Sequence, residues 1–90
     1  MEILIEILLK ENGKMNSFNV TFKNPDEILK FLSIVEKYDI AMDMIRGRLV
    51  VDAKSLLGLM NLGLNNVAEL RVYGDVCGQL RQEISRYMAA

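Results

Sequence analysis

Residues 24–27, Asn24-Pro25-Asp26-Glu27, have the composition of a helix start by several independent rules. Asn24 suits the N-cap, and Pro25 suits the first helical position, where its missing N–H is not needed. Acidic side chains favour the first turn, and Glu27 stands three residues after Asn24, as in a capping box. The apolar residues that follow recur at helical spacing: Ile28, Phe31, Leu32 and Val35. The sequence therefore predicts an amphipathic helix that ends near Tyr38.

The segments around this helix predict further strands and helices. Alternating apolar and polar residues favour strands at 15–22, 40–45, 48–52 and 67–73, and apolar spacing favours helices at 56–62 and 76–87. Arg46-Gly47 suits the turn of a tight hairpin. Ser55 and Gly63 suit the two ends of the short helix. The order from residue 15 is β-α-β-β-α-β-α, which predicts an α+β open-faced β-sandwich with all helices on one face of the sheet.

The first 14 residues stand apart from this domain, which we place at residues 15–90. Asn12-Gly13 is a type I′ hairpin signal, so residues 3–10 are one candidate for an extra N-terminal edge strand paired with residues 15–22. The other interpretation is a leader ahead of Met15. The apolar run is too short to span a bilayer and lacks the positive start of a signal peptide. We expect a cytoplasmic protein with no membrane partner.

Composition excludes several kinds of site. The chain has no histidine, which removes His metal ligands, His general bases and phosphohistidine chemistry, and Cys77 is its one cysteine. We expect Cys77 to be a packed thiol. A formal net charge of −1 argues against nucleic acid as a direct partner. Asp39, Asp43 and Asp52 could suggest a catalytic carboxylate pair. However, Asp39 stands at a predicted strand start, and Asp43 and Asp52 alternate with apolar residues, as on a solvated sheet face. We expect no enzyme activity, no metal and no cofactor.

Ser55 is the candidate functional residue. One interpretation is a helix cap, worth about 1 kcal/mol. The other is a phosphorylation site beside Lys54, where a phosphate would add negative charge. Five large apolar residues follow within seven positions: Leu56, Leu57, Leu59, Met60 and Leu62. Two helical turns have too small a buried face for all five. Either Leu57 and Met60 face outward as a partner surface, or the domain buries the whole set.

Residues 50–64, VVDAKSLLGLMNLGL, resemble the regulatory segment of HPr, the histidine-containing phosphocarrier protein of the bacterial sugar phosphotransferase system. The resemblance covers residues 15–90 in element order, and this segment is its one specific motif. It implies that an HPr kinase/phosphorylase phosphorylates Ser55 and that the product binds a catabolite control repressor. It also implies that Leu56, Leu57 and Met60 form the contact patch for partners, with Lys54 as a supporting contact.

The chain departs from the HPr pattern at the phosphocarrier position. Asn24 stands where HPr has its phosphorylated histidine, and Asp26 stands about where HPr has an arginine. The missing histidine excludes histidine-based phosphoryl transfer. The resemblance is therefore to His-less members such as the catabolite repression homologue of HPr, which keeps the serine and forms dimers by exchanging its first strand. A homodimer is accordingly among the expected partners.

Two functions remain open from the sequence. The first is a regulatory adaptor in carbon catabolite regulation, switched by phosphorylation at Ser55. The alternative is a structural or self-association module on the HPr fold in which Ser55 only caps a helix. A small-ligand sensor domain is a weaker third, since no anion-binding loop or aromatic pocket is evident in the sequence.

Overall fold

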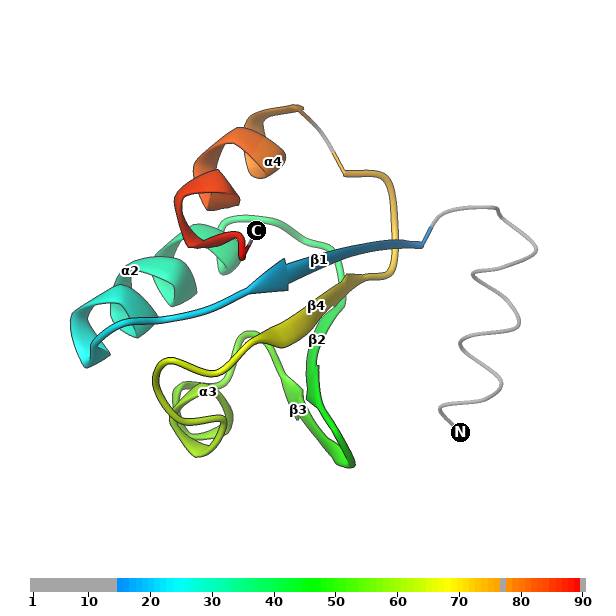
Figure 1. Cartoon of the computed structure of the whole chain (residues 1–90). Helices are drawn as coiled ribbons and strands as arrows, with labels where there is room; N and C mark the ends of the chain where they lie inside the picture. Colours follow the sequence, from blue (N-terminus) through cyan, green and yellow to red (C-terminus); the bar gives the residue numbers. More distant parts are fainter. Residues whose placement is uncertain (1–14, 77, 90) are drawn as a thin grey trace.

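The computed structural model describes residues 15–76 and 78–89 (Figure 1). The elements follow one another in the predicted order. They are β1 (Asn16–Val20), α2 (Pro25–Val35), β2 (Met42–Arg46), β3 (Leu49–Asp52), α3 (Leu56–Asn61), β4 (Ala68–Val72), α4 (Gly78–Ile84) and the 3₁₀ helix η1 (Ser85–Tyr87). The predicted strand at residues 3–10, the alternative leader and Cys77 lie outside the described residues.

The four strands form one antiparallel sheet in the order β1-β4-β2-β3. Side chains on one face of the sheet are buried against the helices, and those on the other face are exposed or half-buried. The buried strand residues alternate as expected for a one-sided sheet: Val20, Met42, Met44, Ala68, Leu70 and Val72. The architecture is the predicted α+β open-faced sandwich, with its core between the sheet and the helix layer.

Three aromatic rings join distant parts of the chain in this core. Phe22 follows β1, Phe31 lies on α2, and Tyr87 closes η1, and all three are buried. Their centroids lie 5.0 Å (Phe22–Phe31), 5.8 Å (Phe31–Tyr87) and 6.0 Å (Phe22–Tyr87) apart, with edge-on or tilted ring planes. Aromatic pairs prefer this geometry, so the cluster fixes the C-terminal helix against α2.

The start of α2 is the predicted one, and its end is earlier. Asn24 caps the helix, because its side-chain oxygen accepts a hydrogen bond from the Glu27 N–H at 3.0 Å. Glu27 reaches back one residue beyond the cap, to the Lys23 N–H at 2.8 Å. The helix ends at Val35 because the next backbone bonds tighten to three-residue turns, from Lys37 N–H to the Ile34 carbonyl and from Tyr38 N–H to the Val35 carbonyl.

Two predicted boundaries shift in the structure. The β2–β3 turn is Gly47-Arg48 and not Arg46-Gly47, since Arg46 pairs with Leu49. Gly47 has φ +61°, so the position that requires a left-handed conformation is the first of the turn. The final helix is shorter than predicted. Its α-helical part begins at Gly78 and ends at Ile84, and one 3₁₀ turn follows to Tyr87.

The C-terminal segment covers part of the outer edge of β1. The Thr21 N–H donates to the Tyr87 carbonyl at 2.8 Å, and the Ala89 N–H donates to the Asn19 carbonyl at 2.8 Å. Val20 and Met88 form a bridge between these two bonds. Residues 87–89 therefore occupy the edge at residues 19–21.

Candidate partner-binding surface around Ser55

Ser55 caps α3, as the first of its two interpretations requires. Its side-chain oxygen accepts a hydrogen bond from the Gly58 N–H at 3.1 Å, and its carbonyl accepts one from the Leu59 N–H at 2.9 Å. The backbone at Ser55 is extended, with φ −110° and ψ 119°, which is usual for an N-cap. The residue is half-buried, so its hydroxyl lies at the protein surface and not in the core.

One face of α3 is fixed to the sheet. Gly58, Leu59 and the cap residue Leu62 are buried. A β-carbon added at Gly58 would lie 2.8 Å from the Val51 β-carbon on β3, which is closer than real contacts. Glycine therefore permits the close approach of α3 to β3. Gly63 follows the helix with φ +82°, as the predicted C-terminal residue in the left-handed conformation.

The opposite face of α3 is apolar and exposed. Leu57 is 75% exposed, Met60 is 54% exposed and Leu56 is 39% exposed. We call these three residues the α3 patch. Leu57 and Met60 face outward, which is the first of the two alternatives that the sequence left open. Leu59 and Leu62 are buried, so the set divides between the core and the surface.

Other exposed apolar side chains were not singled out from the sequence. Leu29 on α2 is 51% exposed, and Val67, just before β4, is 54% exposed. Leu29 directly follows Ile28 and lies off the apolar stripe of α2. Its position off the stripe is the sequence signal that could have indicated its exposure. Val67 begins the predicted strand, where alternation alone does not distinguish a buried end from an exposed one.

Lys54 has a structural contact that the sequence did not indicate. Its side-chain amine donates to the Tyr38 carbonyl at 2.5 Å, beyond the end of α2. Its backbone N–H donates to the Asp52 carboxylate at 2.8 Å. The half-buried Lys54 thus links the loop before α3 to the loop after α2, 16 positions earlier in the chain.

Asn24, where the resemblance to HPr predicts the missing histidine, is exposed at the start of α2. Its side-chain oxygen is engaged in the cap. Asp26, in the first turn, forms an exposed ion pair with Lys30 at 3.0 Å. A negative carboxylate therefore lies within the first turn that Asn24 caps.

The carboxylates of the sheet have structural partners. Asp43 and Asp52 are cross-strand neighbours on β2 and β3. Asp43 accepts a hydrogen bond from the Tyr73 hydroxyl at 3.0 Å, and burial together with this carboxylate raises the pKa of Tyr73. Asp39 and Asp52 are exposed. Within residues 15–76 and 78–89, no group of three His, Cys, Asp or Glu side chains is arranged to hold a metal ion.

The contact between Asp43 and Tyr73 continues into Arg71, which is the cross-strand neighbour of Asp43. Glu69 and Arg71 on β4 form an ion pair at 3.2 Å. A hydrogen bond from Ser17, and then the contact with Arg71, hold the pKa of Glu69 below its usual value. Polar pairs of this kind suit a sheet face that no helix covers and that is in contact with water.

Comparison with known proteins connects this arrangement to a known fold. No protein-family model matches the sequence, and no curated relative matches it. Several solved structures are similar, and two of them are described here. HPr-C-His from Thermoanaerobacter tengcongensis has a TM-score of 0.63 at 22% identity, over 81% of this chain and 88% of that one. The phosphocarrier protein HPr from Bacillus anthracis str. Ames has a TM-score of 0.62 at 17% identity, over 83% and 98%.

The chain has the HPr fold. At these identities the likeness establishes the architecture alone. On the HPr fold, Asn24 caps the first helix of the described domain and Ser55 caps the second. None of the described helices is long and apolar enough to cross a membrane.

Proposed function

We propose that this chain is a non-enzymatic regulatory adaptor on the HPr fold, acting in carbon catabolite regulation. An HPr kinase/phosphorylase phosphorylates Ser55, and the product binds a catabolite control repressor. The observation that supports this most directly is the position of Ser55 beside the α3 patch, where Leu57 is 75% exposed. The two partners are inferred from the resemblance of residues 50–64 to the regulatory segment of HPr.

The chemistry of the surface supports a switch. Phosphorylation would add about −1.5 to −2 charge at neutral pH, next to apolar side chains that are already exposed. A partner with an apolar pocket flanked by Arg or Lys would bind the modified surface better than the unmodified one. Lys54 is a supporting contact in this proposal. Its amine would first have to leave the Tyr38 carbonyl to reach a partner.

The lack of histidine limits the proposal to regulation. The chain has no histidine, and Asn24 and Asp26 stand at the phosphocarrier position. An amide has no nucleophilic nitrogen of the kind an imidazole offers, and the neighbouring carboxylate would repel a phosphoryl group. We therefore assign the chain the serine-dependent role and not the relay of phosphoryl groups to sugar permeases.

Intact-mass measurement after incubation with ATP and an HPr kinase/phosphorylase tests the modification. The parent should gain one phosphate, and Ser55→Ala should gain none. Ser33→Ala is the matched control, because Ser33 is an exposed serine on α2, and it should gain one phosphate like the parent. A phosphate on Ser55→Ala, or none on the folded parent, would contradict the proposal.

A second measurement addresses the surface. Affinity of the repressor for the phosphorylated parent is compared with that for phosphorylated Leu57→Ser. Leu57 is largely exposed, so this change should alter stability by less than about 0.5 kcal/mol while weakening binding.

Equal affinity of the two proteins would remove the α3 patch from the interface. The alternative is self-association through the same patch. A concentration-dependent dimer in sedimentation, present without phosphate and lost in Leu57→Ser, would favour that alternative.

A further inference from the structure

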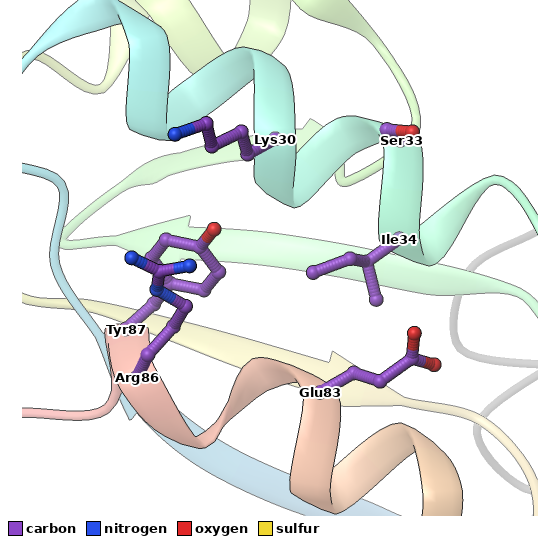
Figure 2. A pocket seen from close by; sticks show the side chains of 6 residues that line it. All are labelled: Lys30, Ser33, Ile34, Glu83, Arg86 and Tyr87. Carbon is purple, nitrogen blue, oxygen red and sulfur yellow. The ribbon is translucent and has the colours of Figure 1, made fainter.

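A groove lies between α2 and the C-terminal helices, and Ser55 is not part of its lining (Figure 2). It has a volume of about 350 Å³ and opens to solvent. Its lining comes from three elements, α2, α4 and η1: Lys30, Ser33, Ile34, Glu83, Arg86 and Tyr87. The volume lies at the lower end of the roughly 300–1,000 Å³ typical of small-molecule sites. We call it the α2–α4 groove.

One end of the groove carries two cations from opposite walls. Figure 2 shows Lys30 extending from α2 and Arg86 from η1 at the same end, with the Tyr87 hydroxyl directed toward α2. The Arg86 guanidinium lies over the Tyr87 ring, 5.5 Å from its centroid. This stacking restricts the arginine to the mouth of the groove and reduces the entropy lost when it binds an anion.

The carboxylates near the groove are already paired. Glu83 lies at the other end and accepts hydrogen bonds from the Lys37 amine at 2.5 Å and from the Tyr38 hydroxyl. These two donors, Lys37 first, hold the pKa of Glu83 below its usual value. Asp26 pairs with Lys30 in an exposed i,i+4 contact, which is worth little and can yield to a ligand.

We infer that the α2–α4 groove binds a small organic anion, a phosphate monoester with a compact apolar body. The lining holds two cations, Lys30 and Arg86, and one carboxylate, Glu83, so the groove is net positive. Glu83 is paired with Lys37, and the positive charge lies at the Arg86 end. A guanidinium matches phosphate oxygens with two parallel hydrogen bonds, and an ammonium adds a point charge from the facing wall. The half-buried Ile34 provides an apolar surface for the rest of the ligand.

Phenyl phosphate is the probe, titrated into the full chain and followed by backbone amide shifts in NMR spectra. Saturating shifts are expected at Ser33, Ile34 and Arg86. Inorganic phosphate and phenol should each bind more weakly than phenyl phosphate, because inorganic phosphate lacks the apolar body and phenol lacks the phosphate. Benzoate in place of phenyl phosphate separates a preference for the phosphate from a preference for any aryl anion.

Charge-removing variants locate the site. Arg86→Gln and Lys30→Gln should each raise the dissociation constant about fivefold, as expected for partly exposed charge contacts. Arg81→Gln is the matched control, since Arg81 is an exposed cation on α4 outside the groove lining, and it should leave the constant unchanged.

Two results would overturn the inference. One is a loss of affinity in Arg81→Gln as large as that in Arg86→Gln. That result would mean that the probe is attracted to the surface charge in general and not to the groove. The other is shifts that fail to saturate or that spread over the surface outside the groove. Unchanged amide spectra of the unliganded variants exclude unfolding as the cause of any loss. Binding is also expected to be unchanged in Ser55→Ala, so the groove and the Ser55 switch are tested separately.

Discussion

Gly58 and Val51 are in contact with no room for a side chain between α3 and β3. A β-carbon built on Gly58 would lie 2.8 Å from the Val51 β-carbon and 3.3 Å from a Val51 methyl carbon. The closer atom is directly attached to the strand backbone, so a change of side-chain rotamer cannot move it away. The position of α3, and with it the position of the α3 patch, depends on this contact.

Gly58→Ala should therefore destabilise the fold. Overpacking costs about 1–3 kcal/mol, and the better helix propensity of alanine returns about 1 kcal/mol. We expect a net loss of up to about 2 kcal/mol in the free energy of unfolding, measured by denaturant titration. Gly78→Ala is the control, because a β-carbon there meets nothing within 4 Å, and it should be neutral or slightly stabilising. Equal stability of the two variants would show that α3 moves freely off the sheet.

Ser55 variants separate the cap from the switch. Ser55→Ala removes the acceptor for the Gly58 N–H and should lower the free energy of unfolding by about 1 kcal/mol. Ser55→Asp keeps a side-chain oxygen at the N-cap and should recover most of that loss. Thermal melting compares the two variants. If both are as stable as the parent, the 3.1 Å hydrogen bond contributes nothing to stability.

Glu83 links stability to acid pH. Lys37 and Tyr38 hold the pKa of Glu83 below its ordinary value of 4.5. The folded state therefore binds the proton less tightly than the unfolded chain does. The stabilisation is fully present above the ordinary pKa and is lost as the pH falls through the lowered one.

Glu83→Gln should accordingly lose less stability than the parent between about pH 5 and about pH 3, measured by thermal melting across that range. Glu36→Gln, which changes an exposed carboxylate beyond the end of α2, should follow the parent. If the Glu83→Gln and parent curves stay parallel throughout, the contacts with Lys37 and Tyr38 do not hold in solution.

The C-terminal cover on β1 can be removed without touching the aromatic cluster. Ending the chain after Tyr87 deletes the bond from the Ala89 N–H to the Asn19 carbonyl and the packing of Met88 on the core. The expected loss is about 1–3 kcal/mol, from one hydrogen bond and one partly buried side chain. Hydrogen exchange at the Thr21 N–H should accelerate, because its acceptor becomes a free terminus. Unchanged exchange would mean that residues 88–89 do not protect the edge.

The features that sequence analysis predicted correctly are those set by near neighbours. The cap at Asn24 needs only Glu27, three positions away, and the cap at Ser55 needs only Gly58. The outward direction of Leu57 and Met60 follows from the small buried area of two helical turns. The hairpin turn was placed one residue early because alternation alone does not show which turn position needs a positive φ, which Gly47 adopts.

The features that were missed depend on residues far apart in the chain. The Lys37–Glu83 pair joins residues 46 positions apart, and the α2–α4 groove exists only because α4 packs on α2. The final helix tightens to a 3₁₀ turn where Tyr87 enters the ring cluster with Phe22 and Phe31. No local pattern around Tyr87 indicates that contact.

The cover on β1 also bears on how the chain is made. β1 is synthesised before the other described elements, yet its sheet neighbour β4 and its edge cover, residues 87–89, come late in the sequence. At roughly 5–20 residues per second, several seconds pass on the ribosome before either arrives. During that interval Phe18, Val20 and Phe22 lack the sheet and edge partners that the described residues supply in the folded domain. A nascent chain with such a strand is a substrate for chaperones, so yield in cells should depend on chaperone supply more than the folded stability suggests.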